Sequence, residues 1–201
     1  MWYKVKRILV GTQQVRPSET VQTFDFQNDW NLWWVWFTKR WTPSYVSWQW
    51  WTIGTNSIES YEAWIMPPSS IYKWTLKQVK IWFSKNNVQT SGTGQGAWIC
   101  NSDLSISCHY THPRSEWPAI LYYTNWSTYF TSAANIYWEI YISYILNDDN
   151  SMVVDINWTT YNIWNYASVF RWLWNNKNLC LDICRWGTDA PYIRKVQIKT
   201  L

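Results

Sequence analysis

Glycine, cysteine and charged residues are all scarce in this chain of 201 residues. It contains 6 Gly and 4 Cys, and only 15% of its residues are charged. So little glycine excludes a collagen-like repeat, and a hydrophobic content of 47% excludes a disordered tail. The net charge of +4 is modest and the basic residues are scattered, so we expect no binding to nucleic acid.

Long apolar runs are missing as well. The best candidate, Ile136 to Leu146, is interrupted by Glu139 and Ser143, and it is shorter than the roughly 18 apolar residues that a membrane-spanning helix needs. The amino terminus is basic, but its apolar run of Ile8 to Val10 is too short for a signal peptide core. The sequence therefore predicts neither a membrane span nor a secretion signal.

Tryptophan is the residue in excess, because 21 Trp stand beside 6 Gly. Trp directly follows Asp29, Asn125 and Asn157, where two-residue hairpin turns ordinarily take Gly because both central residues need positive φ. We hypothesise that many of these positions are Gly in the organism, encoded by a UGA codon that a variant genetic code reads as glycine. The alternative is a truly Trp-rich protein that binds sugars or a membrane surface.

The recoding hypothesis predicts turn positions, several with positive φ or an exposed indole, for five residues: Trp30, Trp41, Trp126, Trp158 and Trp186. Three other tryptophans lie inside strand-like runs, where an aromatic residue is expected, and we interpret them as genuine: Trp64, Trp82 and Trp138.

The pattern of the chain predicts an all-β domain. Runs of β-branched and aromatic residues recur between turn clusters, and no stretch combines helix caps with helical apolar spacing. The clearest strands are Thr20 to Phe26, Ser57 to Ile65, Thr75 to Phe83, Ala119 to Tyr123, Ile136 to Leu146, Ser151 to Asn157, Leu179 to Cys184 and Tyr192 to Thr200. This many strands predicts a sandwich of two antiparallel sheets. We expect the first and last strands to pair, since pairing hides sheet edges.

The remaining segments are assigned as a leader and loops. Residues 1–17 form a basic leader that ends at Pro17, and residues 18–201 form the sandwich. Ser84 to Gly96 and Cys100 to Trp117 are predicted to be long surface loops. Such loops commonly carry function, although plain connectors explain them equally well.

Three segments resemble the concanavalin-A-like, laminin-G-type jelly rolls. They are the hairpin from Tyr137 to Trp158 with its turn at Asn147 to Asn150, the run Tyr61 to Ile65, and the closing strand Tyr192 to Ile198. The resemblance covers roughly residues 20 to 201 and implies an antiparallel two-sheet jelly roll of lectin-like type. The Trp at position 158, where this family has Asn-Gly or Asp-Gly, is the departure that recoding would produce.

The leader is similar to short leaders of phage virion proteins. Alternation along Val5 to Val10 is typical of a strand that adds to the sheet edge of a partner. An extra strand of the same sandwich is the other interpretation. The resemblance implies a virion or another extracellular surface as the location.

Four cysteines, at positions 100, 108, 180 and 184, allow three disulfide pairings, and the sequence does not choose among them. Cys180 and Cys184 would lie about 13 Å apart on one strand at ~3.3 Å per residue, too far for a mutual bridge. Bridges to Cys100 and Cys108, or buried thiols, remain open. A zinc site around Cys108 to His112 competes with them, although a Cys-x-x-Cys pair is missing, and the metal ligands stay unknown.

Carboxylates suited to catalysis are not apparent. Hydrolases of this sandwich class need two carboxylates within reach of each other, and the Glu-x-Asp-x-x-Glu strand of the family is absent. Glu59 and Glu62 would face opposite sides of a strand, and Glu139 has no acidic neighbour. We therefore expect that the protein is not an enzyme, and we rank a glycoside hydrolase below the alternatives.

The sequence thus predicts a non-catalytic carbohydrate-binding or adhesion module, with a glycan as partner and further virion or surface proteins bound through residues 1–17. The alternative is a purely structural virion or surface-decoration protein. No cofactor is required, although the resemblance permits calcium at Asp148 and Asp149, where a plain polar turn is the simpler explanation. The candidate ligand-binding residues form the densest set of aromatic and polar side chains outside the doubtful Trp positions: Tyr110, His112, Arg114, Trp117, Tyr122 and Tyr123.

Overall fold

Strand β6 (Leu76–Ser84) shows how the sequence builds the sheets. Its Val79, Ile81 and Phe83 are completely buried, whereas Gln78 and Lys80 are only partly buried on the other face. Strand β12 (Met152–Ile156) alternates in the same way. Each strand therefore gives one face to a core between two sheets, as the period of two residues predicts.

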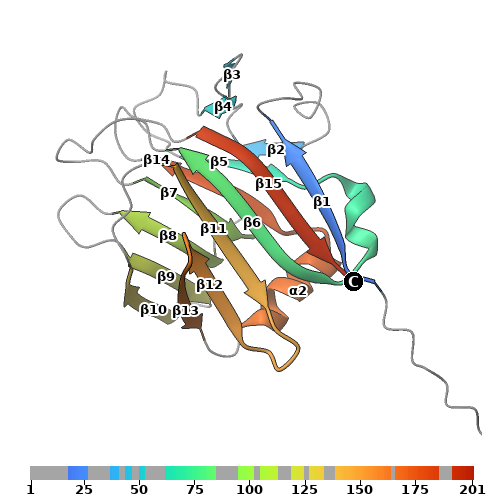
Figure 1. Cartoon of the computed structure of the whole chain (residues 1–201), viewed down its shortest axis with the longest axis vertical. Helices are drawn as coiled ribbons and strands as arrows, with labels where there is room; N and C mark the ends of the chain where they lie inside the picture. Colours follow the sequence, from blue (N-terminus) through green and yellow to red (C-terminus); the bar gives the residue numbers. More distant parts are fainter. Residues whose placement is uncertain are drawn as a thin grey trace, which may run out of the picture.

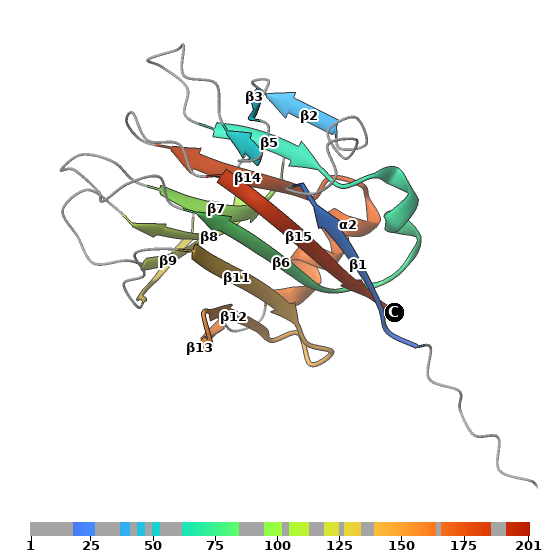
Figure 2. The ribbon, with the colours of Figure 1, turned by 45° about the horizontal axis from the view of Figure 1, so that its top comes forward.

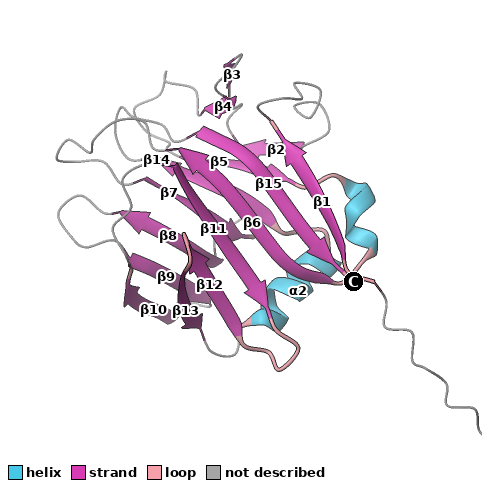
Figure 3. Cartoon of the chain, viewed as in Figure 1, coloured by secondary structure: helices cyan, strands magenta, loops and turns pink. Residues whose placement is uncertain are grey.

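The computed structural model describes residues 18–26, 37–40, 44–46, 50–52, 62–84, 95–101, 105–112, 119–124, 127–133, 139–163, 166–185 and 192–201. Figure 1 and Figure 2 show two layers of strands, with the helices at one end. Figure 3 shows how little of the described chain is helical. The predicted antiparallel two-sheet sandwich is confirmed.

Sheet A has eight strands, and all of its pairs are antiparallel. Its order is β13 (Thr159–Ile163), β12, β11 (Glu139–Leu146), β6, β15 (Tyr192–Thr200), β4 (Trp50–Thr52) and β3 (Ser44–Val46), with β1 (Thr20–Asp25) also on β15. The β1–β15 register runs from Thr20 opposite Thr200 to Asp25 opposite Lys195. This confirms the predicted pairing of the first and last strands.

Sheet B has seven strands and lies behind sheet A in Figure 1. Its order is β10 (Ser127–Ser132), β9 (Ala119–Thr124), β8 (Ile106–His112), β7 (Gln95–Cys100), β14 (Cys180–Arg185), β5 (Glu62–Met66) and β2 (Phe37–Arg40). The eight predicted strands all have counterparts in the two sheets.

The predicted loop from Cys100 to Trp117 is wrong in its middle, because β8 occupies Ile106–His112. Ile106, Cys108 and Tyr110 alternate with polar residues, which is the strand period, but the polar content of the run hid it. The other predicted loop, Ser84 to Gly96, is shorter than expected, because β6 extends to Ser84 and β7 begins at Gln95.

Helix α2 (Ala167–Asn175) is a second correction, since no helix was expected. Its Ala167, Phe170, Leu173 and Trp174 are buried in the core at helical spacing. No local side chain caps it; instead the Asn150 side-chain oxygen accepts a hydrogen bond from Ser168 N at 2.6 Å. A cap supplied from 18 residues away leaves no N-cap signal beside the helix.

The core is closed at the helical end by an aromatic pair. The Tyr72 and Trp174 ring centroids are 4.4 Å apart, and the Trp174 indole N–H donates to the Trp74 carbonyl at 2.7 Å. Tyr72 lies in the short 3-10 helix η1 (Ser69–Lys73). None of the described helices is long and apolar enough to span a membrane.

Residues Asn157 and Trp158 form the two-residue turn between β12 and β13, with φ of 43° and 70°. The Trp158 side chain is 85% exposed. The geometry predicted for Trp158 is confirmed; Trp30, Trp41, Trp126, Trp138 and Trp186 lie outside the described residues, as do residues 1–17. Whether position 158 is truly Gly in the organism stays a hypothesis.

Candidate ligand-binding face

The outer face of sheet A, turned away from the core, carries a cluster of aromatic and charged side chains. We call it the Trp82 patch and define it as Lys80, Trp82, Tyr141, Asp155 and Lys195. Trp82 is one of the tryptophans interpreted as genuine, and it follows Ile81 and precedes Phe83, both core residues. Strand alternation therefore directs its indole to the opposite face.

Cross-strand register brings the patch together from four strands. Trp82 of β6 lies opposite both Tyr141 of β11 and Lys195 of β15. In the next row, Ser143 of β11 lies between Lys80 and Asp155 of β12. Residues more than a hundred positions apart in the sequence thus become neighbours on one surface.

The two lysines lie over the aromatic rings. Lys80 Nζ is 3.8 Å from the Tyr141 ring centroid and 4.7 Å from that of Trp82, while Lys195 Nζ is 5.3 Å from the Trp82 centroid. The two rings are themselves 6.2 Å apart and tilted. The negative faces of the rings stabilise the ammonium groups, typically by about 0.5–1 kcal/mol at exposed sites.

Tyr141 connects the patch to the β12–β13 turn. Its hydroxyl donates to Asp155 Oδ2 at 3.2 Å and accepts from Trp158 N at 2.7 Å, and its ring meets the Trp158 ring edge-on at 5.5 Å. Burial and the neighbouring Asp155 raise the pKa of Tyr141, against the backbone hydrogen bond from Trp158. The hydroxyl is therefore protonated at neutral pH and donates to the carboxylate.

Asp155 has one oxygen without a partner. Its Oδ1 is buried and accepts no hydrogen bond within the part of the chain that the structure describes. A buried acceptor left unpaired costs about 1–3 kcal/mol, so a donor on a ligand would gain from reaching it.

Within the described residues, no ion pair is formed by the two lysines of the patch. Lys77 pairs with Asp148, and Lys199 pairs with Glu19. Among the described residues, neither Lys80 nor Lys195 has a carboxylate within 4.0 Å. Asp25 lies opposite Lys195 in the β1–β15 register.

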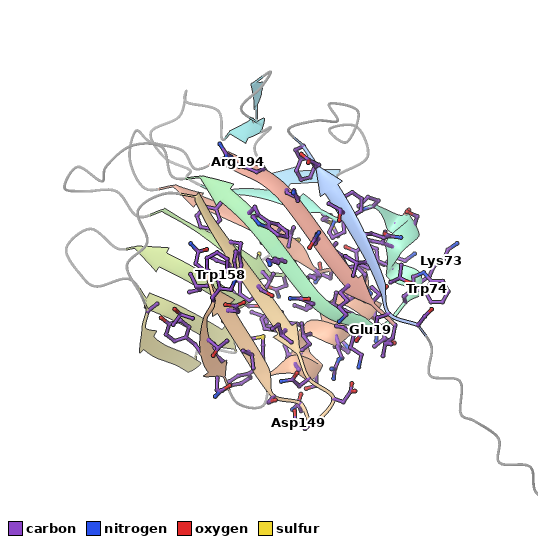
Figure 4. All side chains as sticks on the ribbon, in the orientation of Figure 1. Glu19, Lys73, Trp74, Asp149, Trp158 and Arg194 are labelled. Carbon is purple, nitrogen blue, oxygen red and sulfur yellow. The ribbon has the colours of Figure 1, made fainter. Side chains whose placement is uncertain are left out.

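A β-bulge lies beside the patch. Ile193 pairs with Phe83 and Lys195 with Trp82, which leaves Arg194 as the extra residue. Its carbonyl accepts from Phe26 N at 3.0 Å, and burial lowers the pKa of its guanidinium. Bulges commonly re-aim side chains beside functional sites. Figure 4 shows Arg194 and Trp158 on the part of sheet A that faces the viewer.

The candidate residues named from the sequence fall on sheet B or outside the described residues. Tyr110 and His112 lie in β8, and Tyr122 and Tyr123 in β9, whereas Arg114 and Trp117 are outside the described residues. Tyr122 stands opposite Cys108 and Tyr123 opposite Ser107 in the β8–β9 register. Their role in binding stays a prediction.

The carboxylates considered from the sequence are separated by the fold. Glu62 lies in β5 of sheet B and Glu139 in β11 of sheet A, while Glu59 is outside the described residues.

The two aspartates considered for calcium lie in the β11–β12 turn, and protein groups bind both carboxylates. Asp148 pairs with Lys77 and lies 3.5 Å from Arg171, and Asp149 Oδ1 accepts from Ser151 N at 2.9 Å and from Ser151 Oγ at 2.6 Å. These donors lower the pKa of both carboxyls. Within the described ranges, no group of three His, Cys, Asp or Glu residues is placed to hold a metal.

The cysteines lie in sheet B. Cys100, Cys108 and Cys180 are buried outside any disulfide, and Cys100 stands opposite Cys180 in the β7–β14 register. Burial raises the pKa of the Cys108 thiol well above its usual range. The side chain of Cys184 is outside the description, as are those of His109 and His112, so the zinc interpretation stays open.

The sequence analysis missed the Trp82 patch. A signal was present, because Lys80 and Trp82 lie on the non-core face of a strand that was predicted correctly. The partners from β11, β12 and β15 depend on strand order and register, which the chain does not reveal locally.

Comparison of the fold with solved structures finds neighbours that share it over nearly the whole chain. The apo Crh5 transglycosylase has a TM-score of 0.60 at 9% identity, with 90% of this chain and 84% of that chain covered. An endo-beta-1,3(4)-glucanase from family GH16 has a TM-score of 0.53 at 9% identity, with 92% of each chain covered. A protein of unknown function from Shewanella oneidensis MR-1 has a TM-score of 0.55 at 9% identity, with 94% of this chain and 89% of that chain covered.

These neighbours and the sheet topology define the fold as an antiparallel jelly-roll sandwich of the concanavalin-A-like class, which the sequence predicted. No protein-family description matches the sequence, and no curated protein matches it.

The prediction that the chain is not an enzyme is contradicted, because a transglycosylase and a glucanase are among the fold neighbours. The prediction depended on a missing carboxylate motif along one strand. Side chains from separate strands meet on a sheet face, as Lys80, Tyr141 and Lys195 do here, so spacing along the chain is a poor test for such a site.

Proposed function

We propose that this protein is a carbohydrate-interacting domain that binds a glycan chain across the Trp82 patch. The observation that carries the proposal is the tilted Trp82–Tyr141 pair on the outer face of one sheet, where Trp82 is partly exposed, Tyr141 is buried beside it and charged groups lie next to both. Aromatic rings provide the flat apolar surface on which sugar rings stack, and polar groups at their edges select the hydroxyls.

The printed names of the neighbours support a glycan as the ligand class, since one neighbour is a transglycosylase solved with NAG and another is an endo-glucanase. Asp155 adds a carboxylate beside the aromatic pair, held by the Tyr141 hydroxyl. Conversion of each bound glycan to product should therefore be measured together with its binding.

A glycan array followed by isothermal titration calorimetry tests the proposal. Trp82→Ala should reduce affinity for the array hit roughly tenfold or more, because aromatic contacts dominate such sites. The matched control is Trp172→Ala, which removes an indole that is 58% exposed on α2. Trp82→Phe retains an aromatic surface and should lose less. Product release is measured with each bound glycan, for the wild type and Asp155→Asn.

The residues named from the sequence provide a competing location on sheet B. Tyr123→Ala is the variant for that region, because Tyr123 lies in β9 of sheet B. Loss of binding in Tyr123→Ala with full binding in Trp82→Ala would move the site to sheet B. An array with no hit for the folded wild type would leave the structural-decoration alternative.

We further propose that residues 1–17 attach the domain to a virion or another extracellular surface. The β-branched residues Val5, Ile8 and Val10 favour an extended strand that could add to a partner's sheet. Several copies on one particle would raise the avidity of a weak sugar site. A chain lacking residues 1–17 should fold and bind glycan but fail to join its assembly; unchanged assembly would refute the attachment role.

A further inference from the structure

We propose that the ligand of the Trp82 patch is an acidic glycan, whose carboxylate or sulfate group binds between Lys80 and Lys195 over the Trp82 ring. This inference rests on the proposed function and names the chemical class of the ligand at the same site. It starts from the two ammonium groups, whose Nζ atoms both lie within 5.3 Å of the Trp82 ring centroid.

Two like charges around one ring repel each other. Because the surface is partly buried, water screens this repulsion less than it would at a fully exposed site. In most ordinary surfaces a nearby carboxylate relieves such repulsion. The described part of the chain supplies no ion pair to either lysine, although Lys77 and Lys199 on the same strands are paired. The ring contacts stabilise both ammonium groups but leave their net charge in place.

The lysines are held in position from opposite sides of Trp82. Lys80 is one row away in β6 and contacts both rings, while Lys195 comes from β15 just after the bulge at Arg194. An anion between them would accept a charge-assisted hydrogen bond from each ammonium. The sugar that carries the acid group would then contact the part of the indole that the two ammonium groups leave uncovered, so one monosaccharide would meet both features.

Asp155 limits where the anionic group can lie. It occupies the far side of the patch, in β12, where its Oδ2 accepts from Tyr141 and its Oδ1 has no partner in the described residues. A carboxylate there repels an acid group and attracts a hydroxyl donor. Asp25, opposite Lys195 in the β1–β15 register, sets the same limit on the other side, so the anion site is confined to the space between the two ammonium groups and the hydroxyl-binding side is at Asp155.

Calorimetry with charge-matched glycans tests this inference. Polygalacturonate and its methyl-esterified form have the same backbone and differ in charge, and chondroitin sulfate and chondroitin form a second pair for sulfate. We expect the charged member of at least one pair to bind roughly tenfold tighter at low salt, and the difference to shrink at high salt.

Lys80→Gln and Lys195→Gln should each weaken binding of the charged glycan roughly tenfold, the loss typical of one charge-assisted hydrogen bond. Lys73→Gln, at the end of η1 and on the opposite side of the view from Trp158 in Figure 4, is the control and should bind like the wild type. Thermal melting confirms that all three variants fold.

The outcomes separate the inference from the proposed function. Equal affinity for the charged and neutral members of both pairs overturns the acidic ligand and leaves glycan binding intact. A charge preference that survives both lysine substitutions overturns this location. Failure of every glycan to bind overturns both proposals.

Discussion

The ammonium of Lys80 lies 3.8 Å from the centroid of the Tyr141 ring, across the β6–β11 pair. This contact and the one to Trp82 place a cation in the centre of an aromatic surface. Contacts with two rings restrict a long, flexible side chain, which lowers the conformational entropy that it would lose on binding a ligand.

The Lys80–Tyr141 contact should be measurable as a coupling energy. We expect a double-mutant cycle with Lys80→Met and Tyr141→Leu, followed by urea unfolding, to give about 0.5–1 kcal/mol. A coupling energy of zero would show that the ring does not stabilise the ammonium. The pair Lys77→Met and Tyr141→Leu is the control and should show no coupling.

Position 158 should be more stable with glycine. The Trp158 φ of 70° is in the left-handed region, which Gly adopts freely and a bulky residue resists. Trp158→Gly should raise the free energy of unfolding by roughly 0.5–1 kcal/mol, after loss of the edge-on contact with Tyr141. Trp82→Gly, within β6, should instead destabilise the protein.

A lower stability of Trp158→Gly would remove the structural reason to expect glycine there. The recoding hypothesis itself is tested by the intact mass of the protein from its native host. A mass that fits all 21 Trp would refute it.

Asn150 should stabilise helix α2 through its side-chain oxygen. Asn150→Gly keeps the backbone φ of 70° accessible but removes the acceptor for Ser168 N, so we expect a loss of about 1 kcal/mol in chemical unfolding. Asn150→Ala also resists the left-handed conformation and should lose more. Equal stability of the wild type and Asn150→Gly would show that the cap contributes nothing.

Acid should weaken the ion pair between Asp148 in the β11–β12 turn and Lys77 in β6. Hydrogen bonding and charge from Lys77 hold the pKa of Asp148 below its ordinary value. A depressed folded pKa contributes stability above the unfolded pKa, and that stability is lost as the pH falls through the folded pKa. The difference in Tm between wild type and Asp148→Asn should therefore be present at pH 6 and vanish toward pH 2. A constant difference across that range would exclude the ion pair as its cause.

The fold class could be predicted from the sequence because apolar residues recur at every second position of the strands, and these are the residues that the fold buries. Val79, Ile81 and Phe83 mark a core face, and Val154 between Met152 and Ile156 marks another. The turn at Asn147 to Asn150 was readable from its polar residues, which hydrogen-bond within the turn. Local patterns of this kind need no knowledge of distant strands.

Helix α2 and the candidate site were missed for one physical reason, since both depend on partners remote in sequence. The α2 cap comes from Asn150, and the partners of Trp82 come from β11 and β15. A register shift of one residue would turn every side chain of a strand to the other face, so the patch is specified only once all the strands are paired.

Binding of the tighter of the two charged glycans, polygalacturonate or chondroitin sulfate, to the wild type and to Trp82→Ala tests the central claim most directly, measured by calorimetry beside the Trp172→Ala control. Our account predicts measurable affinity for the wild type and for Trp172→Ala, and a loss of roughly tenfold or more for Trp82→Ala. Equal affinity of all three proteins would contradict a glycan site at the Trp82 patch.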